Sequence, residues 1–229
     1  MQVAARRRRG AVAGREPVAS GDRAASLPDD FYEKIRPRLL QRIGEELREA
    51  RCVLDLGCGG CELGRFLAET CSQEVIGVDI ADGSFPDRHE LKSRTRRLLR
   101  CVKADARRLG FLATGAVDAV VMLWALHELK NPRAVLVEAR RVLRVGGKLL
   151  IVDFPRGSLA QRLWNEDYYT PHQACDLLAA AGYANISVGL VERGQMLWAK
   201  GYRAAKKERT PCVERWVGRK LEVGSRRAS

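Results

Sequence analysis

The chain has 229 residues, which is enough for one α/β domain with a sizeable core and short appendages. No apolar run approaches the ~20 residues that a membrane-spanning helix requires, so no membrane span is expected. The formal net charge is +13, but residues 1–23 hold six arginines against two acids, and residues 203–229 hold nine basic residues against three acids. Nucleic acid therefore stays open as a partner of the tails but is not favoured for the chain as a whole.

The two ends of the chain differ from its middle, and we expect the domain to span residues 27–203. Residues 1–26 carry Arg6-Arg7-Arg8-Arg9 and few large apolar groups, which predicts a disordered basic arm. An arginine-rich transit peptide is the alternative, although the two acids in this stretch are unusual for one. Residues 204–229 form a basic tail that can include a short helix, because its apolar residues fall on one side: Val213, Trp216, Val217 and Leu221.

Seven cysteines are scattered through the sequence, and no secretory signal precedes them. An odd number of cysteines in such a chain predicts reduced thiols and a cytoplasmic location. Cys58 and Cys61 form a C-x-x-C motif, but no second pair of cysteines or histidines lies at the spacing of zinc ligands. We therefore expect no metal site.

The first predicted element is a helix over residues 31–47, with Asp29 or Asp30 near its N-cap. Pro37 has no amide hydrogen and clashes with the preceding turn of a helix, so we expect a break there.

The next stretch is the most informative one. Residues 53–56 are an apolar run that ends in glycines, and residues 62–70 show the apolar spacing of a helix. Residues 75–80 form a second apolar run that carries Asp79 near its end. This order is that of a nucleotide-binding βαβ unit, in which the acid accepts hydrogen bonds from two ribose hydroxyls. The sequence thus predicts a ligand that contains adenosine.

The glycine turn of this unit limits what kind of adenosine compound can bind. Gly57 and Gly59 have no Cβ, so the backbone can approach a ligand closely. A dinucleotide-binding turn has a small residue three places after its second glycine, where the helix N-terminus receives a pyrophosphate. That position is Glu62, whose carboxylate would repel phosphate, and the chain has no P-loop. Cofactors that carry phosphate are therefore disfavoured.

Further along the chain, strand and helix patterns alternate up to a final hairpin. Asn131 is the predicted N-cap of one helix, and Thr170 opens a capping box whose helix ends before Gly182. Residues 186–191 and 195–202 are then the two strands of a hairpin. This alternation is typical of a mostly parallel sheet that is covered by helices on both faces.

Residues 54–59, with the sequence LDLGCG, resemble the first motif of class I S-adenosylmethionine-dependent methyltransferases. Further similar segments follow in the order of the family, at residues 75–80, 103–111, 117–122 and 142–154. The resemblance implies an α/β fold with a Rossmann-like, doubly wound, mostly parallel seven-stranded sheet and a C-terminal β-hairpin. It also implies S-adenosylmethionine as the cofactor, an adenosine with an amino-acid tail and no phosphate.

Within that family, residues 141–155 and 199–203 resemble the type 11 group and the menaquinone and ubiquinone biosynthesis methyltransferases. The resemblance pairs Asp79 with the acid that binds the ribose and Asp105 with the acid that contacts the adenine amino group. Its full set of cofactor-binding residues is Asp55, Gly57, Cys58, Gly59, Asp79, Ile80, Asp105, Ala106 and Trp124. Cys61 stands where many members have a third glycine, and because cysteine is small we expect an altered turn rather than lost binding.

The segment after the fourth strand should border the methyl group and the substrate. His127 is the candidate catalytic base there, since imidazole titrates near neutral pH, and Glu128 could orient it. A loop histidine that shapes the pocket is the alternative, because positioning and exclusion of water can carry an in-line displacement without a base. Tyr168 and Tyr169 are candidate substrate contacts in an aromatic lid, or they pack on the following helix.

Three functions stay open at this stage. The first is an S-adenosylmethionine-dependent methyltransferase that transfers a methyl group to a small-molecule acceptor, quinone-like or otherwise aromatic. The second is an RNA or protein methyltransferase that uses its basic tails to hold an anionic partner. The third is a non-catalytic cofactor-binding interaction domain, which the departure at Cys61 suggests. The sequence leaves the oligomeric state open.

Overall fold

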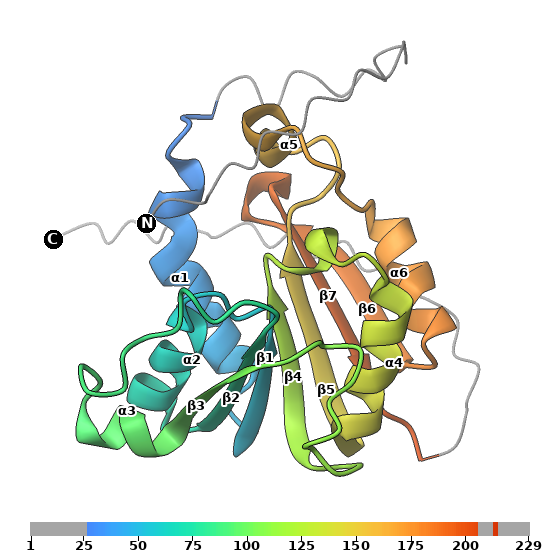
Figure 1. Cartoon of the computed structure of the whole chain (residues 1–229). Coiled ribbons are helices and arrows are strands. Elements are labelled where there is room, and N and C mark those ends of the chain that lie inside the picture. Colours follow the sequence, from blue (N-terminus) through green and yellow to red (C-terminus); the bar gives the residue numbers. More distant parts are fainter. Residues whose placement is uncertain (1–26, 206–212, 215–229) are drawn as a thin grey trace, which may run out of the picture.

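The apolar runs of the sequence form one sheet in the computed structural model, which describes residues 27–205 and 213–214 (Figure 1). The strands lie in the order β3-β2-β1-β4-β5-β7-β6-β8. Their bounds are β1 Cys52–Leu56, β2 Glu74–Asp79, β3 Leu99–Lys103, β4 Val117–Leu123, β5 Leu143–Asp153, β6 Ala184–Val191, β7 Met196–Tyr202 and β8 Val213–Glu214.

The pairing of the strands confirms the predicted fold class. Strands β3, β2, β1, β4 and β5 are parallel neighbours, whereas β7 runs antiparallel to both β5 and β6. Seven strands and a C-terminal hairpin were expected. The eighth, β8, has two residues and pairs in parallel with β6, whose outer edge would otherwise carry unpaired backbone groups.

The predicted helix in the C-terminal tail is wrong at Val213 and Glu214, which are the residues of β8. The spacing of apolar residues does not show which segment pairs with the edge of a sheet. Here, pairing with β6 satisfies backbone hydrogen-bonding groups at that edge. The predicted basic arm and residues 206–212 and 215–229 of the predicted tail lie outside the described residues.

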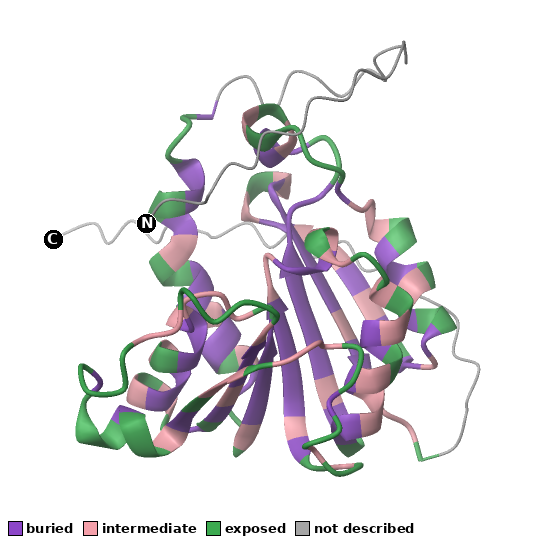
Figure 2. Cartoon of the chain, in the orientation of Figure 1, coloured by how far each residue is buried: buried purple, intermediate pink, exposed green. Residues whose placement is uncertain are grey.

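Helices cover both faces of the sheet (Figures 1 and 2). Their bounds are α1 Phe31–Glu46, α2 Glu62–Phe66, α3 Ser93–Leu98, α4 Pro132–Val142, α5 Leu159–Trp164 and α6 Pro171–Ala180, with 3-10 turns at Leu126–Glu128 and Glu192–Gly194 and a π turn at Leu67–Cys71. One apolar cluster lies between the sheet and α1 and α2, and the other between the sheet and α4 and α6. None of the helices in the described part is both long and apolar enough to cross a membrane.

The central strands are buried on both faces, which is why they read as continuous apolar runs. In β1, Val53 packs into the first cluster and Leu54 into the second, and both side chains are fully buried. At ~25 cal/mol per Å² of apolar surface, each such side chain stabilises the fold by about 1.5–3 kcal/mol.

The leading helix is confirmed, but the predicted break at Pro37 is wrong because α1 continues through it. A proline inside a helix costs about 3 kcal/mol. The buried face of α1 offsets this cost, since Ile35, Leu39 and Ile43 all pack into the first apolar cluster.

The predicted caps at Asn131 and Thr170 are confirmed, whereas Asp30, at the N-cap position of α1, makes no side-chain cap hydrogen bond. Asn131 Oδ1 accepts a hydrogen bond of 3.1 Å from the Ala134 amide at the start of α4. Thr170 and Gln173 form a reciprocal capping box at the start of α6. These caps fix where α4 and α6 begin and therefore where the loops at the carboxyl ends of the strands lie.

Candidate functional site

The carboxyl ends of neighbouring parallel strands bring together acids that are far apart in the sequence. Asp79 is the last residue of β2 and Asp153 the last of β5, and Trp124 directly follows β4. Asp79 is held in place by the Gly59 amide, which donates to Oδ2 at 2.9 Å, and by the Ala81 amide, which donates to Oδ1 at 3.0 Å. The glycine turn and Asp79 thus form one hydrogen-bonded unit.

The glycine turn follows β1 and is shaped by close contacts. Gly57 has φ +74°, and a Cβ there would lie 2.5 Å from Ala125 Cβ, so this position excludes larger residues. Gly59 has φ +48° but open space around its Cβ position. Cys61, which stands where the family often has glycine, adopts a left-handed backbone with φ 55°. Because the space beside Gly59 is open, a ligand can approach the backbone there.

Asp55 lies beneath this turn, on β1, and only 2% of its surface is exposed. Burial, and to a lesser degree the charge of Asp79, raises the pKa of Asp55 to about 7. A positively charged ligand at the turn would favour ionised Asp55.

The predicted adenine-binding segment lies beside Asp79. Ile80 exposes 70% of its side chain, which is unusual for a large apolar residue and leaves a surface on which a planar ring can stack. Asp105, which follows β3, pairs with Arg107 through Oδ1 at 3.0 Å and Oδ2 at 2.6 Å. These hydrogen bonds lower the pKa of Asp105 to about 2. Ala106 is half-buried next to it.

His127 lies in the 3-10 turn after β4 and is paired with Asp153. Its Nδ1 is 2.7 Å from Asp153 Oδ1, and its backbone amide donates to Asp153 Oδ2 at 3.0 Å. Both side chains are buried, with 6% and 2% of their surfaces exposed. Its Nε2 is 3.3 Å from Glu166 Oε2 but 4.0 Å from Glu128 Oε1. Asp153 therefore orients the imidazole, and Glu128, suggested for this role by the sequence, does not bond to it.

The charges around His127 determine its protonation. Burial lowers the pKa of His127, but the hydrogen bond and charge of Asp153, with the charges of Glu128 and Glu166, outweigh burial and raise it overall. In the neutral form Nδ1–H would donate to Asp153, and Nε2, 3.3 Å from Glu166 Oε2, would be the unprotonated nitrogen.

Aromatic rings from four segments form one cluster, and two of them, Phe154 and Tyr168, contact the His127 ring. The Phe154 ring stacks on the Trp124 ring with 5.4 Å between the ring centres, and it meets the Tyr168 ring edge-on at 5.6 Å. The centres of the Tyr168 and His127 rings are 4.9 Å apart. Tyr32 of α1 lies 4.8 Å from Phe154. The buried Trp124 Nε1 and Tyr168 Oη have no hydrogen-bond partner among the described residues, so a bound molecule could supply one.

The two candidate tyrosines do not form one lid. Tyr168 is 2% exposed and packs in the first apolar cluster, whereas Tyr169 packs against the second cluster, which contains residues of α6. Successive residues of an extended segment point to opposite sides, which separates them. Only Tyr168 borders His127.

Sequence reasoning missed Arg36 of α1. Its guanidinium carbon lies 5.0 Å from the centre of the Trp124 ring, and Nη2 is 2.7 Å from Glu62 Oε2. Arg36 Nε is buried without a hydrogen-bond partner among the described residues. The helix thus brings a cation against Trp124, at the edge of the sheet where the strands end. The signal available in the sequence was that Arg36 is a charged residue next to the apolar face of an amphipathic helix.

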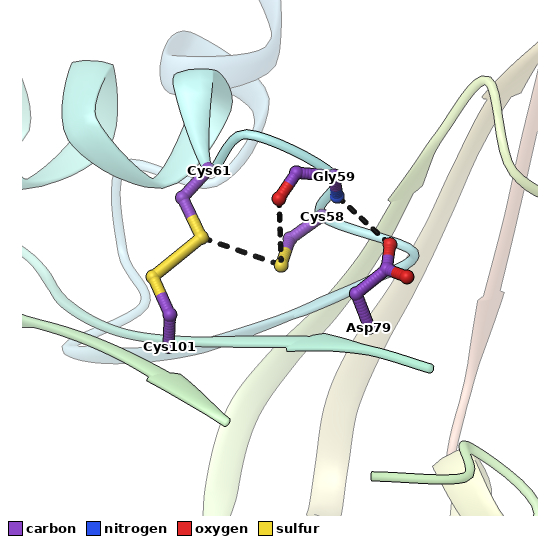
Figure 3. The surroundings of a disulfide bond; sticks show 5 residues. All are labelled: Cys58, Gly59, Cys61, Asp79 and Cys101. Carbon is purple, nitrogen blue, oxygen red and sulfur yellow. Dashed lines mark hydrogen bonds between the residues drawn. A yellow bond between two sulfur atoms is a disulfide. The ribbon is translucent and has the colours of Figure 1, made fainter. Parts of the chain in front are cut away.

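The expectation that every cysteine is a reduced thiol is wrong, because a disulfide joins Cys61 to Cys101 (Figure 3). Cys52, Cys58 and Cys71 are free thiols. The parallel pairing of β2 with β3 brings Cys101 beside the glycine turn, and spacing along the sequence does not reveal that proximity. Among the described residues, no group of three or more potential ligands is placed to hold a metal.

The order of the strands, with the candidate site at their carboxyl ends, is that of the class I methyltransferase fold. Residues 54–151 match the family model described as a methyltransferase domain. This part of the chain is similar to class I S-adenosylmethionine-dependent methyltransferase domains.

Relatives and solved structures show the same similarity. The malonyl-[acyl-carrier protein] O-methyltransferase of Laribacter hongkongensis is 36% identical over 142 residues, which are 58% of this chain and 46% of that protein. The demethylmenaquinone methyltransferase of Thermus thermophilus is 34% identical over 144 residues, or 55% of this chain and 64% of that protein. The chain thus spans less than two thirds of either relative. The structure of human N-acetylserotonin methyltransferase with S-adenosylmethionine superposes with a TM-score of 0.60 at 15% identity, covering 77% of this chain and 54% of that one, and shows the shared fold.

Proposed function

We propose that the protein transfers a methyl group from S-adenosylmethionine to a small-molecule acceptor, with quinone-like or other aromatic acceptors favoured. The His127–Asp153 pair carries the proposal, because it stands among aromatic rings at the edge of the sheet where the glycine turn lies. Two relatives are named for the molecule that they methylate, malonyl-[acyl-carrier protein] in one and demethylmenaquinone in the other. These names support an acceptor that carries a carbonyl group or a ring.

The residues present fit an adenosine cofactor without phosphate. Asp79 would accept hydrogen bonds from the ribose hydroxyls, and Ile80 would lie against the adenine, which Asp105 and Ala106 border. Open space at Gly59 admits the rest of the molecule.

The amino-acid part of the cofactor would lie between Asp55, Arg36 and the loop that starts at Trp124. Arg36 has an unpaired buried Nε that suits a carboxylate, and ionised Asp55 suits an ammonium group. When bound, the cofactor supplies a methyl group on a positively charged sulfur. A dinucleotide stays disfavoured because Glu62 occupies the position where a dinucleotide-binding turn has a small residue.

The acceptor would lie against the rings of Trp124, Phe154 and Tyr168. His127 Nε2 would take a proton from a weakly acidic group of the acceptor, such as an aromatic hydroxyl. Asp153 is a positioning residue, because it holds Nδ1 and the backbone amide of His127. The buried rings exclude water from the path of the displacement.

The first test is calorimetric titration of S-adenosylhomocysteine into the wild type and Asp79→Ala, with NAD as the control ligand. We expect binding to the wild type, at least about tenfold weaker binding to Asp79→Ala, and none of NAD. A folded wild type that binds no S-adenosylhomocysteine would overturn the proposal. Confirmed binding would be followed by a screen of aromatic acceptors with labelled S-adenosylmethionine.

A further inference from the structure

Three sulfur atoms gather beside the glycine turn (Figure 3). Cys61, at the start of α2, is joined by a disulfide to Cys101 on β3, and the free Cys58 Sγ lies 3.3 Å from Cys61 Sγ. Cys61 is fully buried, and Cys58 and Cys101 are half-buried. None of the roles assigned above uses these sulfur atoms.

The sheet leaves space for this cluster at one residue. Gly77 on β2 pairs with Asp55 of β1 on one side and with Cys101 of β3 on the other. A Cβ at Gly77 would lie 3.0 Å from both Cys58 Sγ and Cys61 Sγ, closer than such atoms pack. The sulfur atoms therefore rest directly on the backbone of the strand that ends in Asp79.

We propose that Cys61 and Cys101 form a reducible disulfide, with Cys58 as its neighbouring thiol, whose redox state sets the affinity of the glycine turn for the cofactor. This inference rests on the proposed function. The reductant is a dithiol: its two thiols become a disulfide and give up two electrons and two protons, while the Cys61–Cys101 bond breaks and both residues become thiols.

The bridge acts on the turn because it anchors one of its ends. At the β1 end, the amides of Gly57 and Cys58 donate to the Val78 carbonyl at 2.8 and 3.2 Å. At the α2 end, the covalent bond ties Cys61 to β3. Between these anchors, the Gly59 amide donates to Asp79. A turn fixed at both ends loses less conformational entropy when a ligand binds, so the oxidised form should bind more tightly.

Cys58 is placed beside the bridge but is held as a thiol. Burial raises the pKa of the Cys58 thiol, and the charges of Asp55 and Asp79 raise it further. The thiolate is the attacking species in disulfide exchange, so Cys58 leaves the Cys61–Cys101 bond intact at rest.

The test measures S-adenosylhomocysteine binding to the full chain in its oxidised form and in excess dithiothreitol, with the bridge mapped by peptide mass spectrometry. We expect the dissociation constant to rise about fivefold or more on reduction. Cys101→Ser should bind as weakly as the reduced wild type and be insensitive to dithiothreitol. Cys71→Ser, which removes a free thiol away from the turn, should respond as the wild type does.

Thermodynamic linkage supplies a second readout. If reduction weakens binding by a given factor, saturating S-adenosylhomocysteine must shift the dithiothreitol–protein equilibrium toward the disulfide by the same factor. Equal affinities in the two redox states, or an oxidised protein without a Cys61–Cys101 bridge, would overturn the inference while leaving the proposed function intact. Absence of binding in both states would instead overturn the proposed function on which the inference rests.

Discussion

His127 has Asp153 at one ring nitrogen and Glu166 near the other, both from the segment that starts at the end of β5. Because these carboxylates raise its pKa, the protonated ring contributes stability below the unfolded pKa of about 6.5. That contribution is lost as pH rises through the folded pKa. The neutral ring, which is the form able to act as a base, is populated above the folded pKa.

Asp153→Asn should lower the pKa of His127, because the neutral amide no longer favours the imidazolium. NMR titration of the His127 ring protons checks this shift without any substrate. Methyl transfer to an acceptor found by screening should fall at least about tenfold, because the ring loses its orientation. Glu128→Gln is the matched control, since its carboxylate is 4.0 Å from Nε2 and should change both readouts less. An unchanged His127 pKa in Asp153→Asn would contradict the assigned role.

Asp55 should make cofactor binding depend on pH. The pKa of Asp55 is about 7 in the empty folded protein and near 3.8 in the unfolded chain. Between these two pH values the folded protein therefore holds a proton on Asp55 that the unfolded chain has lost. The unliganded fold therefore loses stability as pH rises from about 4 to about 7. A cationic cofactor favours the ionised form, so affinity for S-adenosylmethionine should increase up to about pH 7 with proton release. Calorimetry in buffers of different ionisation enthalpy measures that release, and Asp55→Asn should abolish it.

At the scale of elements, the glycine turn after β1 and the loop after β4 fit closely against each other. Gly57 approaches Ala125, and the residue before Ala125, Trp124, has a left-handed backbone with φ 56°. Such a conformation in a large residue persists only where the surroundings enforce it, and it aims the Trp124 ring at Phe154. The turn proposed to hold the cofactor and the loop that carries His127 are therefore positioned together.

Gly57→Ala should disturb both segments, because its Cβ would clash with Ala125 and because φ is +74°. We expect the free energy of unfolding to fall by about 1–3 kcal/mol and S-adenosylhomocysteine binding to weaken. Gly83→Ala, where a Cβ meets nothing within 4 Å, is the control and should change neither. Urea denaturation and calorimetry measure the two effects, and wild-type values for Gly57→Ala would refute the close fit.

At the scale of the whole molecule, Glu46 ties α1 to two strands of the sheet. Lys148 on β5 donates to Glu46 Oε1 at 2.7 Å, and Lys200 on β7 donates to Oε2 at 3.1 Å. Burial would raise the pKa of Glu46, but the two lysines outweigh burial and lower it. The helix that brings Arg36 against Trp124 is thus fixed at its far end by charge.

Glu46→Gln should lower the free energy of unfolding at pH 7 by about 1–2 kcal/mol, between the values for exposed and buried ion pairs. Because the folded pKa is lowered, the stabilisation is present above the unfolded pKa, near 4.5, and is lost as pH falls through the folded value. Thermal unfolding at pH 7 and pH 3 should therefore separate the variant from the wild type only at pH 7. Glu49→Gln, which changes an exposed acid three residues further along the chain, is the control.

The sequence predicted those features that short stretches determine. The caps at Asn131 and Thr170, the glycine turn and the strand that ends in Asp79 each depend on a few adjacent residues. The pairing of His127 with Asp153 and of Cys61 with Cys101 depends on which strands are neighbours. Pro37 and β8 were mispredicted because tertiary packing and edge pairing outweighed local preference.

The strand order has a consequence for the order in which a growing chain can assemble. β1, in the interior of the sheet, pairs with β2 on one side and with β4 on the other, and β4 is made only after residue 116. Asp153 is the last residue of β5, so a nascent chain can complete the glycine turn and Asp79 well before His127 has its partner. During synthesis, the parts proposed to hold the cofactor therefore precede the part proposed to use it.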